Sequence, residues 1–315
     1  MNAPPITAVQ ITGLTRVYGS LVALGNLHLT VNQGDLFGFI GSNGAGKTTT
    51  LRILATFLAP SSGKATIFGR DVVHEADAIR HIVGYMPDFF GVYKDMEVTE
   101  YLDFFGACYR IPSAQRDRTV ADVLELVGLT EKRGTLIGAL SRGMQQRIGL
   151  ARVLIHDPKL LLLDEPASGL DPRARIEMMA VLHELQRMGK TIIISSHILS
   201  ELQTLCNRVA IIEKGSLIYS GPVLGAQQQI SDTAVYWVKV RGEPQPAITF
   251  LQSLPNIVGV EPVDDRIKLT FSSHETDPAM VPELLVRQGI RLLEFYEDEV
   301  DLEKVFLHVT KGETQ

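Results

Sequence analysis

The segment at residues 41–48, GSNGAGKT, most constrains what this chain can fold into, because it fits the pattern GxxxxGK[ST]. An apolar run, DLFGFI, precedes it and a helical pattern follows, which predicts a turn between a buried strand and a helix. In such a turn, backbone N–H groups surround phosphate oxygens, Lys47 reaches the β and γ phosphates, and the Thr48 hydroxyl binds Mg²⁺. This context disfavours the alternative, a glycine-rich turn with an incidental lysine. The predicted phosphate-binding residues are Gly41, Ser42, Asn43, Gly44, Ala45, Gly46, Lys47, Thr48 and Thr49.

Two further apolar runs end in polar residues. KLLLL at residues 159–163 leads into DEP, and TIIIS at residues 191–195 leads into SHILSEL. Short apolar runs that alternate with longer helical patterns are typical of an α/β domain with a largely parallel sheet. Ligands of such sheets bind outside the carboxyl ends of the strands. We therefore expect the polar residues after these three strands to form one site.

Three ionisable residues follow the second and third of these strands. Asp164 and Glu165 are neighbours, and because successive side chains of a strand point to opposite sides, we expect the two carboxylates to face different surroundings. Asp164 is then the Mg²⁺ ligand, and Glu165 polarises an attacking water. His197 is expected to contact the γ phosphate or to hold that water, and a purely structural histidine is the alternative.

The rest of the chain predicts a helical insertion and a second domain. Residues 98–152 have the apolar spacing of helices and are interpreted as part of an inserted lobe at about residues 90–152. A polar, linker-like stretch at residues 226–232 is followed by short alternating runs in the order βαββαβ, which is typical of a small, ferredoxin-like α+β domain. A last helix is expected at residues 300–310. The predicted domains are residues 1–225 and residues 226–315.

Composition limits the classes of function. The 315 residues carry a formal net charge of −6 without a basic tail, which argues against nucleic-acid binding. The N-terminus lacks the regions of a secretory signal, and two cysteines suit a reducing compartment, so we expect a cytoplasmic protein. Both cysteines, Cys108 and Cys206, are expected to be packing residues. No run approaches the roughly 18 apolar residues of a membrane span, so a role at a membrane requires a partner.

Further motifs give the chain a family resemblance. Residues 139–155, ALSRGMQQRIGLARVLI, resemble the LSGGQ signature segment of ABC transporter ATPases. SGLDP at residues 168–172 resembles their D-loop, and SSH at residues 195–197 resembles their switch-histidine segment. Tyr18 occupies the place of the aromatic residue that stacks on adenine. The motifs cover residues 6 to about 222 in the order of the family, and the tail resembles the ABC-2 exporter branch.

The resemblance implies a P-loop NTPase (RecA-like) core, ATP and Mg²⁺ as cofactors, and a head-to-tail homodimer with two ATP molecules between the subunits. Ser141, Arg142 and Gly143 of the signature and Asp171 of the D-loop are then nucleotide-binding residues, the signature acting on the ATP of the other subunit. Ser141 and Gly143 open a helix, so a hydroxyl and N–H groups would point at a phosphate. An ordinary serine helix cap describes the same geometry within one chain.

Three places depart from the family pattern. Ser42 replaces a common proline and is expected to matter little. Arg142 and Met144 replace the usual glycine and glutamine of the signature, which leaves the side-chain contacts to the partner's nucleotide open. Asp88, in GYMPDFFGVY, holds the place of a glutamine that reaches the Mg²⁺ and the attacking water. Two interpretations stay open for Asp88: a Mg²⁺ ligand, or a residue that only caps a turn.

The aromatic residues after Asp88 also have two interpretations. Phe89, Phe90 and Tyr93 either pack within the helical lobe or form an exposed cluster on which a permease docks. The sequence favours neither of them by itself.

The function that the resemblance implies is an ATP-binding and ATP-hydrolysing subunit that drives a separate integral membrane permease, with export as the expected direction. Such a subunit is peripheral on the cytoplasmic face of the cell membrane. The alternative is a soluble ABC ATPase that acts on ribosomes or nucleic acid; a single nucleotide domain and the short stretch between Lys47 and Asp164 disfavour it. A catalytically inactive module is disfavoured by the presence of Lys47, Glu165 and His197 together. For the second domain, bracing of the dimer or contact with a partner is favoured over binding of a small regulator.

Overall fold

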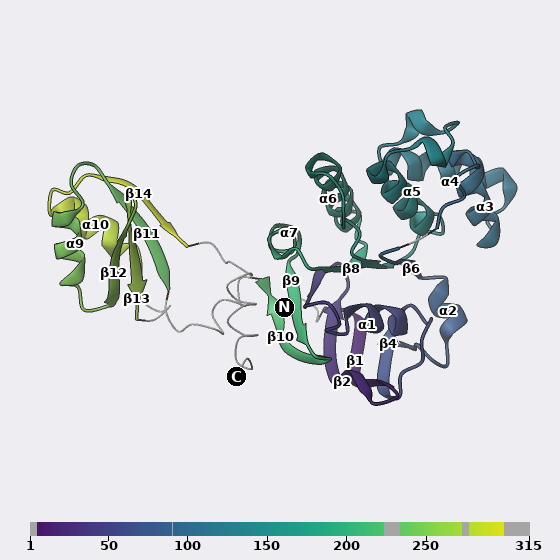
Figure 1. The fold of residues 1–315 in the computed structure, drawn as a ribbon, viewed down its shortest axis with the longest axis horizontal. Helices are drawn as coiled ribbons and strands as arrows, with labels where there is room; N and C mark the ends of the chain where they lie inside the picture. The colour runs from purple at the N-terminus through teal and green to yellow at the C-terminus, as the bar shows by residue number, and fades with distance from the viewer. Residues whose placement is uncertain (1–4, 90, 224–233, 273–276, 299–315) are drawn as a thin grey trace. The chain divides into compact units, whose positions relative to one another are not determined.

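Two units make up the chain in the computed structural model, residues 1–222 and residues 223–315 (Figure 1). The structure describes residues 5–89, 91–223, 234–272 and 277–298. The predicted linker at residues 226–232, the predicted domain boundary after residue 225 and the predicted helix at residues 300–310 lie outside these described residues.

The first unit contains two sheets. An antiparallel sheet has the strand order β2-β1-β4-β5, and a second sheet has the order β10-β9-β3-β8-β7-β6. In the second sheet the strands from β9 to β6 run parallel to one another, and only β10 at the edge is antiparallel, which confirms the predicted largely parallel sheet. The strands are β1 (Thr7–Tyr18), β2 (Leu21–Asn32), β3 (Leu36–Ile40), β4 (Ser62–Ile67), β5 (Arg70–Asp71), β6 (Val83–Met86), β7 (Leu160–Asp164), β8 (Thr191–Ser196), β9 (Arg208–Glu213) and β10 (Ser216–Pro222).

The three apolar runs singled out in the sequence form β3, β7 and β8. Every residue of these strands is buried, as expected for central parallel strands that are covered on both faces. β8 pairs with β3 on one side and with β7 on the other. The carboxyl ends of the three strands therefore lie next to one another at one edge of the sheet.

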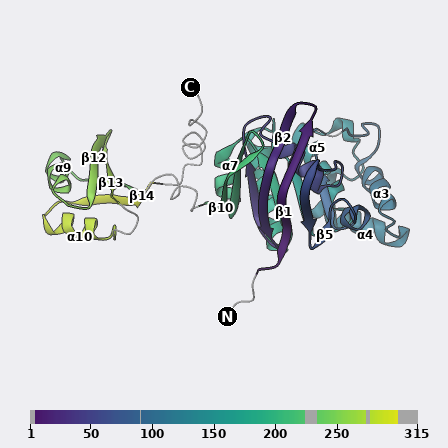
Figure 2. The same cartoon turned by 90° about the horizontal axis from the view of Figure 1, so that it is seen from below.

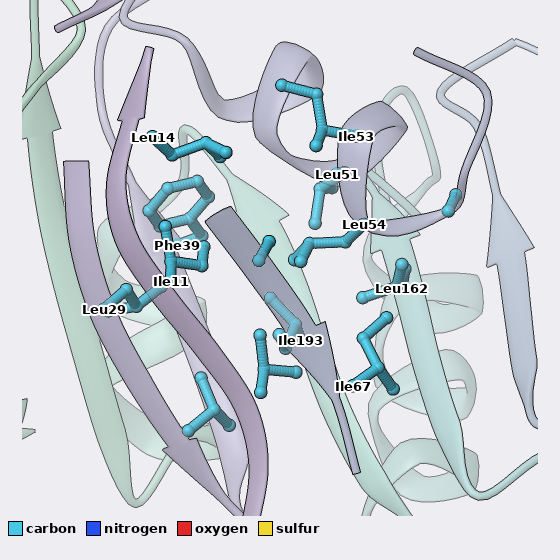
Figure 3. Close-up of a cluster of buried hydrophobic side chains, with 14 of the residues drawn as sticks. Ile11, Leu14, Leu29, Phe39, Leu51, Ile53, Leu54, Ile67, Leu162 and Ile193 are labelled. Atoms are coloured by element: carbon cyan, nitrogen blue, oxygen red, sulfur yellow. The ribbon is translucent and has the colours of Figure 1, made fainter. Parts of the chain in front are cut away.

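The helix after the glycine-rich turn, α1 (Lys47–Leu54), packs against strands of both sheets. Its residues Leu51 and Ile53 share one buried core with Ile11 of β1, Phe39 of β3 and Leu162 of β7 (Figure 3). Burying one such side chain contributes about 1.5–3 kcal/mol. This shared core holds the start of α1 in place relative to β3 and β7.

Three helices form the predicted helical lobe: α3 (Val98–Cys108), α4 (Ser113–Leu126) and α5 (Arg142–Leu154). They lie together at the side of the first unit away from β10 (Figures 1 and 2). The lobe is tied to the core near β6, because the ring of Tyr109 stacks on His156, whose Nε2 is 3.1 Å from the carbonyl oxygen of Val83. The other helices of this unit that the argument uses are α6 (Pro172–Arg187) and α7 (Leu199–Leu205). No helix in the described part of the chain is long and apolar enough to cross a membrane.

The two cysteines have different surroundings. Both are free thiols, Cys206 being buried after α7 and Cys108 being exposed at the end of α3. The expectation of a packing role is therefore confirmed for Cys206. It is wrong for Cys108, because this last residue of α3 is exposed to solvent.

The second unit has the predicted element order βαββαβ: β11 (Val235–Val240), α9 (Gln245–Gln252), β12 (Ile257–Val263), β13 (Arg266–Phe271), α10 (Met280–Arg287) and β14 (Leu292–Glu297). Its antiparallel sheet has the order β12-β13-β11-β14, so the last strand lies beside the first, as in ferredoxin-like folds. Val238, Leu269 and Phe271 of the sheet share one buried core with Leu251 of α9 and Leu285 of α10.

Candidate functional site

A cavity of about 300 Å³ lies at the carboxyl ends of the central strands. Because β3, β7 and β8 end side by side, residues from distant parts of the sequence meet there. The lining consists of Tyr18, Leu21, Ala23, Ser42, Asn43, Gly44, Ala45, Gly46, Lys47, Thr48, Thr49, Asp88, Asp164 and Glu165. The structure thus brings together most of the predicted site residues of one chain. Leu21 and Ala23 of β2 are apolar lining residues that sequence reasoning did not identify.

Two glycines allow the turn before α1 to take its shape. A side chain on Gly41 would place its Cβ 2.5 Å from the carbonyl oxygen of Ile212, and one on Gly46 would place its Cβ 2.8 Å from that of Ala23. Gly46 also has a φ of 109°, which favours glycine, and it precedes α1 without a side-chain cap. The first N–H groups of α1 are therefore free of a capping side chain, which suits binding of an anion.

The ammonium group of Lys47 is buried at the floor of the cavity. It donates hydrogen bonds to the carbonyl oxygens of Gly41 at 2.6 Å and Ser42 at 3.3 Å, and the residue is only 6% exposed. Desolvation lowers the pKa of Lys47, while the negative charges of Glu165 and Asp164 oppose that shift. The lysine is held by the backbone of its own turn, in a place where a phosphate can replace the carbonyl partners.

Asp164 is the last residue of β7 and is almost completely buried. The hydroxyl of Ser195, on the neighbouring strand β8, donates a hydrogen bond of 2.6 Å to its Oδ1. The same hydroxyl accepts a 3.1 Å hydrogen bond from the backbone N–H of Glu165. Ser195 thus orients both acidic residues, a role that the sequence analysis missed although Ser195 belongs to the SSH segment.

Glu165 departs from the sequence-based expectation. The strand ends at Asp164, and Glu165 has a φ of 50°, so strand alternation does not apply to it. Both residues line the same cavity, so the reason given in the sequence analysis, strand alternation, is wrong. What separates them is their partners: Ser195 for Asp164, and two basic side chains for Glu165.

The carboxylate of Glu165 lies between His197 and Lys47. His197 Nδ1 is 2.8 Å from Glu165 Oε2, and Lys47 Nζ is 3.9 Å from Glu165 Oε1. His197 is not among the residues that line the cavity, and 54% of its side chain is exposed. The predicted catalytic residues are thus in direct contact, with the histidine on the outer side.

The predicted metal ligands are oxygen donors on the wall of the cavity. The hydroxyl of Thr48 and the carboxylates of Asp164 and Asp88 belong to three separate segments, and Asp88 is the exposed member of the set. One hydroxyl and one or two carboxylates, completed by phosphate and water oxygens, fit the preference of Mg²⁺. The described residues contain no group of three His, Cys, Asp or Glu side chains that could hold a metal ion by itself.

Tyr18 lines the cavity, and the residue is 43% exposed. The guanidinium group of Arg16 lies 4.6 Å from the centre of this ring and donates a 2.9 Å hydrogen bond to the carbonyl oxygen of Ala59. One face of the ring is therefore covered by a cation that is itself anchored. Arg16 is another residue that the sequence analysis missed; its sequence signal is the spacing of two from Tyr18.

The signature and D-loop residues do not line this cavity. Ser141 caps α5 by accepting a 3.3 Å hydrogen bond from the N–H of Met144, so the helix-cap interpretation describes it within one chain. Asp171 caps α6 in the same way, by a 3.0 Å hydrogen bond from the N–H of Ala174. A Cβ on Gly143 would lie 2.6 Å from that of Ala174, so glycine is needed where α5 approaches α6.

Arg142 contacts the D-loop of its own chain. Its Nη2 donates a 3.3 Å hydrogen bond to the carbonyl oxygen of Ser168, and its guanidinium group lies against Gly169. The arginine that replaces a glycine of the usual signature therefore connects the start of α5 to the segment before Asp171.

The aromatic residues after β6 divide between the two interpretations. Tyr93 makes edge contacts with Tyr101 and Phe104 of the lobe, each with 6.1 Å between ring centres. Phe89 is 88% exposed. Phe90 lies outside the described residues. Tyr93 thus packs against the lobe while 56% of it stays exposed, and Phe89 is almost fully exposed.

Known proteins resemble this chain over nearly its whole length. The family described as ABC transporter matches residues 24–168. The bacitracin transport ATP-binding protein BcrA of Bacillus licheniformis is 35% identical over 309 residues, which cover 98% of this chain and 99% of that protein. The Nod factor export ATP-binding protein I of Rhizobium sp. (strain N33) is 33% identical over 309 residues, which cover 98% of each chain. A solved structure of an ATP-binding subunit of an ABC transporter has a TM-score of 0.64 at 25% identity and covers 71% of this chain and 93% of that one.

Proposed function

This chain belongs to the ATP-binding proteins of ABC transporters, and from that premise we propose that it couples ATP hydrolysis to export through a separate integral membrane permease. The chain is an ATPase. The main support for the proposal is the contact of Glu165 with His197 and Lys47. It lies beside a cavity that is lined by the glycine-rich turn.

The residues of the cavity have distinct proposed roles toward ATP. Lys47 exchanges its carbonyl partners for the β and γ phosphates, and the N–H groups at the start of α1 bind phosphate oxygens. Tyr18 stacks on the adenine through the face that Arg16 does not cover. Thr48 and Asp164 hold Mg²⁺, which when bound neutralises charge on the phosphates. Asp88 is proposed as a further ligand of the ion.

Glu165 and His197 are the proposed hydrolytic residues. The carboxylate of Glu165 accepts a hydrogen bond from the attacking water and draws its proton, while Lys47 stabilises the charge that develops on the γ phosphate. His197, now bonded to Glu165, contacts the γ phosphate when that carboxylate turns to the water. The 3.1 Å hydrogen bond from the Glu165 N–H to Ser195 keeps the backbone of the base in place during this change.

A homodimer is proposed to complete the site. Ser141, Arg142 and Gly143 lie outside the cavity of their own chain, and the helix that Ser141 begins has an N-terminus suited to an anion. In a head-to-tail dimer this terminus and Asp171 would meet the ATP of the other subunit. Each cavity would then take its phosphate-binding turn from one subunit and its signature from the other.

The proposed partner is an integral membrane permease, which would place the subunit on the cytoplasmic face of the cell membrane. Export is favoured because the Nod factor relative is named as an export protein and the bacitracin relative as a transport protein. Phe89 is the proposed contact with the permease, because a large apolar side chain with 88% exposure suits a docking surface. These relatives do not support the alternative of an ATPase that acts on ribosomes, and the net charge of −6 argues against nucleic acid.

The variant Glu165→Gln tests the hydrolytic proposal. Loss of the base should slow phosphate release by roughly a hundredfold or more, while ATP binding persists and an ATP-bound dimer accumulates. Phosphate release and size-exclusion chromatography with ATP measure the two effects, and Glu184→Gln on the exposed surface of α6 is the control. Fast turnover by Glu165→Gln would remove Glu165 as the base.

Purification from native membranes tests the partner, and recovery with ribosomes in place of a membrane protein would favour the alternative function.

A further inference from the structure

An ion pair joins the two helices that follow the Asp171 and His197 segments. Arg175 of α6 and Glu201 of α7 meet with 2.8 Å between Nε and Oε1, and only 10% of the Glu201 side chain is exposed. α6 begins directly after Asp171, and α7 begins at Leu199, shortly after His197. Neither member of the pair lines the nucleotide cavity. The pair therefore connects the segment of Asp171 to the segment of His197 from outside the cavity.

The surroundings of Glu201 connect its charge to the catalytic pair. Burial raises the pKa of Glu201, the charges of Arg175 and His197 lower it, and the charge of Glu165 raises it. The Glu201 carboxylate thus lies near enough to His197 and Glu165 for their charges to affect its pKa. A buried ion pair stabilises a fold only weakly, because desolvation offsets much of the attraction between the charges. A role in placing His197 accounts better for a carboxylate at this position.

α6 has a second ion pair on a different side. Glu177 Oε2 is 3.0 Å from Arg147 Nη2 of α5, which belongs to the helical lobe. Each residue of a helix is rotated by about 100° from the one before it, so residues two positions apart point to nearly opposite sides. α6 is therefore joined to the lobe through Glu177 and to α7 through Arg175. These two ion pairs form a continuous path from the lobe through α6 to the start of α7.

We propose that Glu201 is a positioning residue for His197. Through the Arg175–Glu201 ion pair, the position of α6 then determines whether His197 keeps its contact with Glu165. The inference rests on the proposed function of the site. When α6 moves with the lobe or with Asp171, Arg175 moves Glu201 and the start of α7 with it. His197 then changes its distance from Glu165. Glu201 does not line the nucleotide cavity, and it lies in the first turn of the helix that follows His197, so we expect it to act on the position of His197.

The first experiment measures steady-state ATP hydrolysis by the full-length variant Glu201→Gln, which keeps the shape of the side chain and removes its charge. Misplacement of a catalytic group should lower kcat by about tenfold, whereas KM for ATP should stay within about twofold because no residue of the cavity changes. Asp103→Asn is the matched control, since it breaks a 2.6 Å ion pair with Arg116 in the lobe and should leave kcat unchanged. Arg175→Lys, which keeps the charge, should retain most of kcat.

A double-mutant cycle separates positioning from a general structural effect. In the His197→Ala background, Glu201→Gln should cause no further loss of kcat, because the residue on which Glu201 acts is gone. The cycle also works if Glu201→Gln lowers the melting temperature, since the same substitution is compared in both backgrounds. A structural role of the pair would reduce kcat by the same factor in both backgrounds.

Several outcomes overturn the inference. They are an unchanged kcat in Glu201→Gln, an equal loss of kcat with and without His197, or a loss that appears in KM and leaves kcat intact. The proposed function is tested separately by the unmodified chain. If it fails to hydrolyse ATP, the proposed function fails, whereas hydrolysis by the unmodified chain together with an unaffected Glu201→Gln variant overturns only the positioning role.

Discussion

The two halves of the nucleotide cavity are held in place in different ways. In the phosphate-binding half, Lys47 and Asp164 are 6% and 1% exposed, and their partners are backbone carbonyl groups and a buried hydroxyl of the next strand. In the switching half, Glu165 and His197 contact each other through their side chains, and 54% of the His197 side chain is exposed. The first half is built into the sheet, whereas the second depends on contacts that can be exchanged.

Binding and switching therefore depend on different physical properties, namely burial with fixed backbone partners for binding and exchangeable side-chain contacts for switching. A buried group with backbone partners is preorganised, so it binds a phosphate without a costly rearrangement. A carboxylate between two basic side chains has two alternative partners, so a ligand that takes one of them shifts its position. Variants of the first half should therefore change stability or the affinity for ATP and Mg²⁺, whereas variants of the second half should change turnover.

Lys47→Ala should have the largest effect on binding. It removes the buried cation that is expected to bond two phosphates, each such charge-assisted bond contributing about 1.5–3 kcal/mol. Affinity for ATP should fall by roughly a hundredfold, which equilibrium binding of a fluorescent ATP analogue can measure. Lys190→Ala, which removes a lysine paired with Asp157 outside the cavity, should leave the affinity unchanged. Equal affinity in Lys47→Ala would count against the phosphate-binding turn.

Ser195→Ala should weaken the phosphate-binding half without touching the nucleotide. It leaves the buried Asp164 without its 2.6 Å hydrogen bond, a loss that costs about 1–3 kcal/mol. The melting temperature should fall, and the Mg²⁺ concentration for half-maximal ATPase activity should rise about tenfold. Ser196→Ala is the control, because the Ser196 hydroxyl accepts the N–H of Ile198 and has no bond to Asp164. A change in stability without a change in Mg²⁺ response would restrict Ser195 to a structural role.

The sequence predicts the fold well wherever local pattern and topology agree. β3, β7 and β8 are continuous apolar runs that only a central parallel strand can bury, and the glycine-rich turn marks the start of α1. The βαββαβ order of the second unit follows from alternating runs of strand length. Cys108 shows the limit, since apolar spacing indicates a helix but does not say whether its last residue faces the lobe or the solvent.

Prediction of the site fails where a contact depends on a neighbouring strand. Ser195 and Asp164 are far apart in the sequence, and only the β7–β8 pairing brings them together. The run of apolar residues that ends in DE likewise does not indicate that Glu165 has a left-handed backbone conformation. Arg16 contacts Tyr18 because both lie at the end of β1, which no motif marks. Residue types were therefore predictable, whereas their orientation was not.

Tyr18→Ala should have a smaller effect on ATP binding than Lys47→Ala. Base stacking on an aromatic side chain contributes about 1–3 kcal/mol, so KM for ATP should rise about tenfold with kcat unchanged. Arg16→Ala keeps the ring and removes the cation beneath it, so KM should rise only about twofold. Initial rates over a range of ATP concentrations check both values. Tyr18→Phe is the matched control, because it keeps the aromatic ring. A KM for Tyr18→Phe as high as that of Tyr18→Ala would argue against stacking.

Asp88→Asn should have a small effect and distinguishes the two interpretations of this residue. Asp88 lines the cavity beside the proposed Mg²⁺ ligands, yet it is exposed, so solvent screens its charge. If its carboxylate binds the ion, the neutral amide should raise the Mg²⁺ concentration for half-maximal ATPase activity by about threefold, with KM for ATP unchanged at saturating Mg²⁺. Asp95→Asn, in the same segment but outside the cavity, is the control. An unaltered Mg²⁺ response in Asp88→Asn would leave the turn-capping interpretation and remove Asp88 from the proposed ligands of the ion.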